Sequence, residues 1–128
     1  MAASSKSTEV PEDRLRLYRQ LLEAVPGVAE KSNFGSAYTA VNGNMYSMIS
    51  KHGVVGIRLP DAERTTFMAQ YDTDLFRGDP AWPPAKEFVA VPDDLLERTD
   101  ELALYLERSL AYVLTLKPKA PRRATSGR

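Results

Sequence analysis

A short hairpin turn near the middle of the chain limits how this sequence can fold. An Asn-Gly pair at positions 42 and 43 separates two β-prone runs, residues 37–41 and 44–50. Asn-Gly favours a type I′ turn, which needs positive φ at both central residues. A second turn that contains His52 and Gly53 leads to another β-prone run at 54–59. Strands joined by such short turns run antiparallel, so the sequence predicts a three-stranded meander.

The second turn decides which residues share a face of this meander. If the turn has two residues, Tyr38, Ser47 and Arg58 lie opposite one another on the open face of the sheet. If it has three and includes Lys51, the third strand flips and Arg58 lies beside Tyr46 instead. With the two-residue turn, the open face also includes Met45 and Ile49, and the core face includes Tyr46, Met48, Val55, Ile57 and Leu59.

Helical patterns flank the meander on both sides. Apolar residues recur at three- and four-residue spacing over 15–25, and Pro60 with Asp61 begins a second helix that extends to about residue 71. A third helix is predicted from Thr99 to about residue 116. Its apolar surface exceeds one face and includes Leu104, Leu110, Ala111 and Leu114. This helix therefore either lies in the middle of the fold or meets another subunit.

The order of these elements indicates an α+β fold. A further strand is predicted at 86–91, and Leu75 and Phe76 form a candidate short strand before it. Helix, three strands, helix, one or two strands and helix suit an antiparallel sheet with helices packed on one face. The predicted single domain spans 11–116, and we expect disorder in residues 1–10 and 117–128.

Cysteine and histidine content excludes several kinds of site. The chain has no cysteine, so it lacks a disulfide framework, a thiolate nucleophile and any cysteine-based metal centre. Its one histidine, His52, falls in a tight turn, which favours an exposed turn residue over a catalytic base. The glycines have neither of the spacings that cradle phosphates. We therefore expect a protein that is not an enzyme and that has no cofactor and no metal site.

The charges are balanced in number but not in position. Seventeen Lys and Arg residues match seventeen Asp and Glu residues. The tail holds five basic residues and no acid, so the remaining body is five charges negative. Such a body is a poor match for phosphate backbones, and we expect nucleic acid to bind only weakly, through the tail. The start lacks the apolar stretch of a signal peptide and no run is long enough to span a membrane, which predicts a cytoplasmic protein.

Two parts of the sequence supply candidate binding residues. Arg58 is the only charge inside the three strands, so it is either an ordinary solvated residue or a contact for an anion or a partner. The segment Trp82-Pro83-Pro84, followed by Lys86, is either a plug at the core edge or an anchor for a ligand or partner. The candidate ligand- or partner-binding residues are therefore Tyr38, Met45, Ser47, Arg58, Trp82 and Lys86.

Several segments together resemble a known family. They are Asn33-Phe34-Gly35, the hairpin at 42–46, the run at 88–96 and the closing helix at 100–113. Through them, residues 12–116 resemble the N-terminal domain of the TfoX/Sxy competence regulators. The resemblance implies a fold similar to that of type III secretion chaperones, with the order α-β-β-β-α-β-β-α and frequent dimerisation. It implies no known enzymatic activity, and a regulatory role beside a transcription factor of the cyclic-AMP receptor type.

These observations predict a non-catalytic interaction or regulatory module that acts through protein–protein contacts as a homodimer. Its candidate partner is a protein of the transcription machinery. The alternative is a small-molecule sensor with a pocket between the sheet and the Trp82 loop. The third helix and the open sheet face both carry surplus apolar surface, and the sequence slightly favours the sheet face as the dimer contact. Arg58 buried there would need Ser47, Tyr38 or an acid of the second subunit as a partner.

The charge distribution generates a first prediction. Truncation after Leu116 should leave the melting temperature nearly unchanged, because a disordered tail makes few contacts, and should lower non-specific DNA affinity. Thermal unfolding and a DNA titration at fixed salt measure the two effects. A fall of many degrees in melting temperature would show that the tail is packed.

Overall fold

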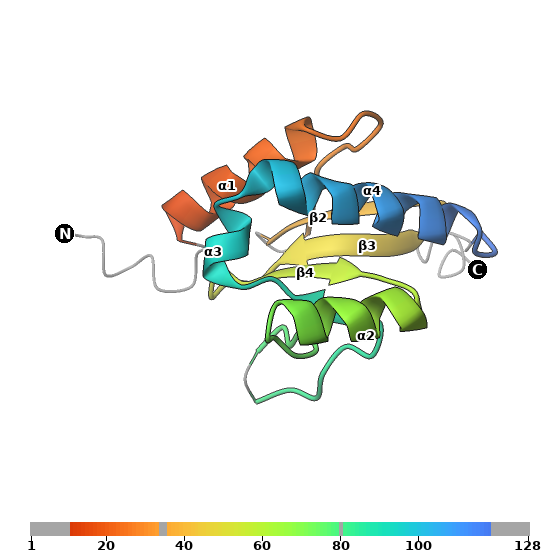
Figure 1. Cartoon of the computed structure of the whole chain (residues 1–128). Helices are drawn as coiled ribbons and strands as arrows, with labels where there is room; N and C mark the ends of the chain where they lie inside the picture. Colours follow the sequence, from red (N-terminus) through yellow and green to blue (C-terminus); the bar gives the residue numbers. More distant parts are fainter. Residues whose placement is uncertain (1–10, 34–35, 80, 119–128) are drawn as a thin grey trace.

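A computed structural model describes residues 11–33, 36–79 and 81–118, and it shows one antiparallel sheet with helices on one of its faces (Figure 1). The strands lie in the order β1-β2-β3-β4-β5, and each neighbouring pair is antiparallel. The predicted α+β fold is therefore confirmed. The elements are α1 (Glu12–Glu23), β1 (Lys31–Asn33), β2 (Ser36–Val41), β3 (Asn44–Ile49), β4 (Val55–Arg58), α2 (Asp61–Gln70), β5 (Phe88–Ala90), α3 (Asp93–Leu96) and α4 (Thr99–Leu114).

Only a small part of the two expected tails lies within the described residues. The disorder expected at 1–10 and 119–128 concerns residues outside the described part of the chain. Lys117, the first residue of the expected tail, does contact the sheet. Its carbonyl oxygen accepts a hydrogen bond from Asn44 Nδ2 at 3.2 Å.

Besides the meander and β5, the sheet has one further strand. It is not the short strand expected at Leu75 and Phe76. Residues 31–33 form β1, which pairs with β2 at the edge of the sheet. Leu75 makes only a single bridge, to Val89. The polar Lys-Ser-Asn sequence of β1 carries no local strand pattern. Its extended conformation is imposed by pairing with β2 rather than by β-propensity.

The first turn of the meander has the predicted type. Asn42 and Gly43 have φ values of 54° and 79°, and the flanking residues Val41 and Asn44 are paired. Positive φ at both central residues defines the type I′ turn. The Asn-Gly hairpin between β2 and β3 is therefore confirmed.

The second turn has three residues, so the two-residue turn is wrong and the alternative that includes Lys51 is right. Ser50 N donates to the Val54 carbonyl at 2.9 Å, and Gly53 has a φ of 85°. The Ser50 hydroxyl oxygen also accepts hydrogen bonds from the amides of His52 and Val54, each at 3.2 Å. A glycine with positive φ at the end of a three-residue loop is a common hairpin geometry.

An irregularity in β3 changes which of its residues face the helices. Thr39 pairs with Ser47, but the next pair is Ala40 with Met45, so Tyr46 has no partner in β2. This extra residue is a β-bulge, which interrupts the alternation of faces. Tyr46 and Ser47 are both buried, with 2% and 0% of their surface exposed.

Because of the bulge, three residues of β3 lie on the opposite face from the one expected. Ser47 and Ile49, expected on the open face, are buried in the core. Met48, expected in the core, is half-buried and lines the open face with Met45. The expected core positions of Tyr46, Val55, Ile57 and Leu59 are confirmed by burial.

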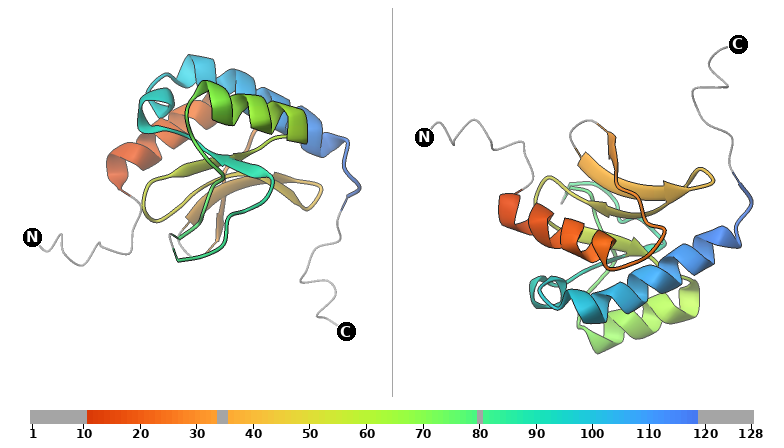
Figure 2. Two further views of the ribbon diagram at one scale, coloured as in Figure 1. Left: turned by 60° about the horizontal axis from the view of Figure 1, so that its bottom comes forward. Right: turned by 90° about the horizontal axis from the view of Figure 1, so that it is seen from above.

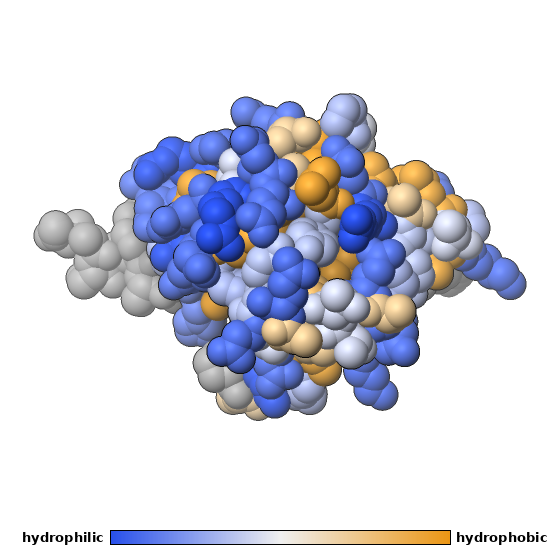
Figure 3. Space-filling model, in the orientation of Figure 1, coloured by the Kyte–Doolittle hydropathy of each residue, from blue (hydrophilic) through white to orange (hydrophobic). Residues whose placement is uncertain are grey.

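Helix α4 lies in the middle of the helical layer, between α1 and α2 (Figure 2). Its inner face is fully buried at Leu102, Leu106 and Val113. Its outer face still exposes Leu104 and Leu114, at 55% and 53%. Apolar surface is accordingly visible over α4 (Figure 3). The helix is central, as one interpretation expected, and it also keeps surplus apolar surface.

The loop between α2 and β5 covers part of the other face of the sheet, and its packing generates a prediction. Phe76 is buried at 1%, and a Cβ atom at Gly56 would lie 2.6 Å from its Cγ atom. Gly56→Ala should therefore destabilise the protein by about 1–3 kcal/mol. Urea unfolding measures this change.

A double-mutant cycle with Phe76→Ala provides the control. In the Phe76→Ala background the ring is absent, so Gly56→Ala should cost much less. An equal cost in both backgrounds would contradict the packing of Phe76 on Gly56.

Candidate ligand-binding face of the sheet

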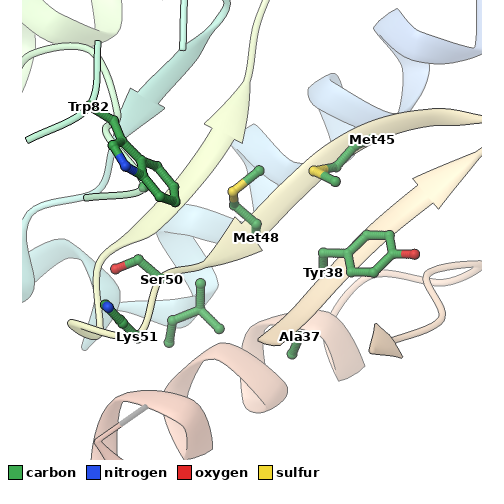
Figure 4. Close-up of a pocket in the computed structure, with 9 residues that line it drawn as sticks. Ala37, Tyr38, Met45, Met48, Ser50, Lys51 and Trp82 are labelled. Carbon is green, nitrogen blue, oxygen red and sulfur yellow. The ribbon is translucent and has the colours of Figure 1, made fainter. Parts of the chain in front are cut away.

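The sheet face opposite the helices holds a pocket of about 240 Å³. Met45 and Met48 of β3 form its middle, and Tyr38 of β2 and Trp82 of the loop before β5 stand at opposite sides (Figure 4). Ser50 and Lys51 lie at one end, where β3 enters its turn. The wall is thus mainly aromatic and thioether, with one cationic side chain.

Trp82 is an exposed wall rather than a plug. The core-edge position is taken by Phe76, whereas Trp82 is 60% exposed. Its indole packs against Gly78, where an added Cβ atom would lie 3.0 Å from the ring. Of the two roles expected for Trp82, the plug is therefore wrong and the anchor stays a prediction.

Asp79 holds the Trp82 segment against the second turn of the meander. Its carboxylate accepts a hydrogen bond from the Ala81 amide at 2.9 Å, and its carbonyl oxygen accepts one from the Trp82 amide at 2.9 Å. Its second carboxylate oxygen lies 3.7 Å from His52 Nε2 and 4.0 Å from Lys51 Nζ. Arg77 also donates to the Trp82 carbonyl. The pocket wall is therefore fixed from several directions.

The protonation of Asp79 follows from these contacts. The Ala81 amide is the main cause that lowers the pKa of this carboxyl below its usual value, and His52 and Lys51 lower it further. Partial desolvation opposes them. A lowered pKa means that the carboxylate contacts support the folded loop at neutral pH and are lost as the pH falls through that lowered pKa.

Arg58 is paired within the chain rather than free for an anion. Its Nε donates to Glu87 Oε1 at 2.7 Å, and its Nη1 donates to the Met45 carbonyl at 3.3 Å. Its guanidinium also lies 5.9 Å from the centre of the Tyr112 ring. The expected alignment with Tyr38 and Ser47 is wrong because the three-residue turn shifts β4. The acid that pairs with this partly buried guanidinium is Glu87 of the same chain.

Ser47 belongs to a buried hydroxyl chain on the helix side of the sheet. Its Oγ lies 2.7 Å from the Tyr18 hydroxyl oxygen and 2.6 Å from Thr39 Oγ1. Burial raises the pKa of Tyr18 well above its usual value. These contacts join α1 to the sheet, and they place Ser47 away from the pocket.

Lys86 is the last of the expected binding residues, and several residues that line the pocket were not expected. Lys86 is exposed, and the pocket is not lined by it. Sequence reasoning did not name the other lining residues as site residues, and these are Ala37, Met48, Ile49, Ser50, Lys51 and Gly78. Met48 was hidden by the bulge, and Gly78 is one of several glycines with no distinguishing pattern. Lys51 was considered only for the length of its turn.

Comparison with known proteins assigns no family: no protein-family model and no curated protein sequence matches the chain.

Within the described ranges, no group of three or more acidic, histidine or cysteine side chains is placed to hold a metal ion. Nor is any helix in those ranges long and apolar enough to cross a membrane.

The anchoring of Trp82 generates a prediction. Asp79→Ala removes the side-chain contacts to Ala81, Lys51 and His52, so the indole should become mobile. The single tryptophan gives one indole N–H resonance, and its order parameter should fall from about 0.85 to below about 0.6. Asp72→Asn is the control, since Asp72 is exposed and has a φ of 53° that asparagine tolerates. An unchanged order parameter in Asp79→Ala would show that Asp79 does not fix the wall.

Proposed function

We propose that this chain is a non-catalytic interaction module in which two copies associate through α4 and leave the open sheet face available to a partner. The outer face of α4 carries the proposal. Leu104, Ala111 and Leu114 are exposed on it although the rest of the helix is central to the fold. Exposed apolar side chains that together form a patch on one helix are typical of an interface.

The spacing of these residues suits a two-fold antiparallel contact. Residues 104, 111 and 114 lie within one outward sector of a helix with 3.6 residues per turn. In an antiparallel pair, Leu104 of one copy meets Leu114 of the other, and the contact is the same from both sides. On the open sheet face, slightly favoured by the sequence, Ile49 lines the pocket but is only 1% exposed, so it adds little apolar surface for a dimer contact.

The TfoX/Sxy resemblance supports a regulatory setting for this module. We extend the proposal to a cytoplasmic protein whose partner belongs to the transcription machinery. A second candidate function is a small-molecule sensor, and a specific observation favours it. The pocket of about 240 Å³ lies between the sheet and Trp82, where such a sensor would hold its ligand.

Sedimentation tests the dimer. The wild type should be a dimer at about 100 µM, because one helix pair gives a small interface with a dissociation constant in the micromolar range. Leu114→Asp should be monomeric, since a carboxylate in an apolar interface is left unpaired.

Met45→Asp is the matched control, because it adds the same charge on the opposite face of the molecule and should leave the dimer intact. Circular dichroism confirms that both variants fold. A monomeric wild type would reject the homodimer. Dissociation by Met45→Asp alone would move the interface to the sheet face.

A further inference from the structure

We infer that the sheet-face pocket binds a small planar aromatic acid of one or two fused rings. The inference rests on the second candidate function, a small-molecule sensor with its pocket on the open sheet face, and it names the ligand class. Size, wall chemistry and charge each contribute to it.

The volume limits the ligand to a small one. Pockets for drug-sized molecules measure about 300–1,000 Å³. The present pocket, at about 240 Å³, is smaller. A long lipid chain or a nucleotide exceeds it, whereas one or two rings fit.

The walls favour a flat aromatic molecule. Trp82 and Tyr38 line the hollow at opposite sides, with Met45 and Met48 between them (Figure 4). Aromatic rings prefer offset-stacked or edge-to-face contacts, and thioethers make favourable contacts with rings. The Trp82 wall is already held in place by Gly78 and Asp79, so little side-chain freedom is lost on binding.

The polar end favours an acidic substituent. Lys51 lines this end, and Ser50 lies beside it. The Ser50 hydroxyl oxygen accepts hydrogen bonds from the backbone amides of His52 and Val54, which fixes this side chain against the turn. Among the described residues, the acidic group paired with Lys51 is Asp79, at 4.0 Å, and it also lies 3.7 Å from His52. A ligand carboxylate at this end would therefore meet the Lys51 cation.

Methionine-methyl NMR provides the test, because the chain has four methionines and Met68 of α2 is an internal reference. The probes are 2-naphthoate, 2-naphthol and 2-naphthylmethylammonium, which share one ring system and differ in charge. The acid should shift the Met45 and Met48 methyl signals saturably and leave Met68 unchanged. It should bind about two- to fivefold more tightly than the neutral probe, as expected for a half-exposed cation. The ammonium probe should bind most weakly.

Substitutions separate the contributions. Lys51→Met should abolish the preference for the acid over the neutral probe, and Trp82→Ala should weaken all binding at least about tenfold. Lys86→Met is the matched control, since Lys86 is exposed and outside the pocket, and it should change neither. The ligand class is overturned if the ammonium probe binds as tightly as the acid, or if Lys51→Met keeps the preference.

Sedimentation of the same samples distinguishes failure of this inference from failure of the proposed dimer. A wild type that dimerises through α4 but shows no saturable shift at Met45 and Met48 overturns the ligand alone. A monomeric wild type that binds 2-naphthoate overturns the dimer and supports the ligand.

Discussion

The bulge in β3, held by the buried hydroxyl chain of Tyr18, Ser47 and Thr39, is the constraint on which the rest of the structure depends. It turns two successive residues toward the helices. Each hydrogen bond of this chain contributes only about 0.5–1.5 kcal/mol net, but leaving one of these buried hydroxyls unpaired would cost about 1–3 kcal/mol. The same residue shift brings Met48 to the open face. Met45 and Met48 therefore line the pocket together because a polar contact on the opposite side of the sheet holds the bulge.

The two faces of the molecule are consequently suited to different kinds of contact. The helical face offers the outward side of α4, a line of separate apolar side chains on a convex surface. The sheet face offers a hollow whose Trp82 wall is fixed by Gly78 and Asp79. Because the surfaces lie on opposite sides of the sheet, association through α4 would leave the hollow accessible.

Local patterns in the sequence were sufficient for the features that depend on local chemistry. Asn42 and Gly43 predicted their own turn, and helical periodicity predicted α1, α2 and α4. The site was less predictable: Tyr38, Met45 and Trp82 were named, but Ser47 and Arg58 were misplaced. Their positions depend on the bulge and on the three-residue turn, which arise from packing between distant segments. A shift of one residue reverses the faces of the residues that follow it, as at Ser47, Met48 and Ile49. The second shift, at the three-residue turn, restores the expected faces in β4.

The edges of the sheet have a consequence for the behaviour of the chain at high concentration. The outer side of β5 is hydrogen-bonded at both ends of the strand, since Phe76 N donates to the Phe88 carbonyl and Ala90 N donates to the Asp74 carbonyl. At the other edge, β1 has three residues and begins with the exposed Lys31. A short edge strand with a lysine is a poor template for adding a further strand. The fold thereby disfavours edge-to-edge aggregation, and contacts between copies are directed to side-chain surfaces.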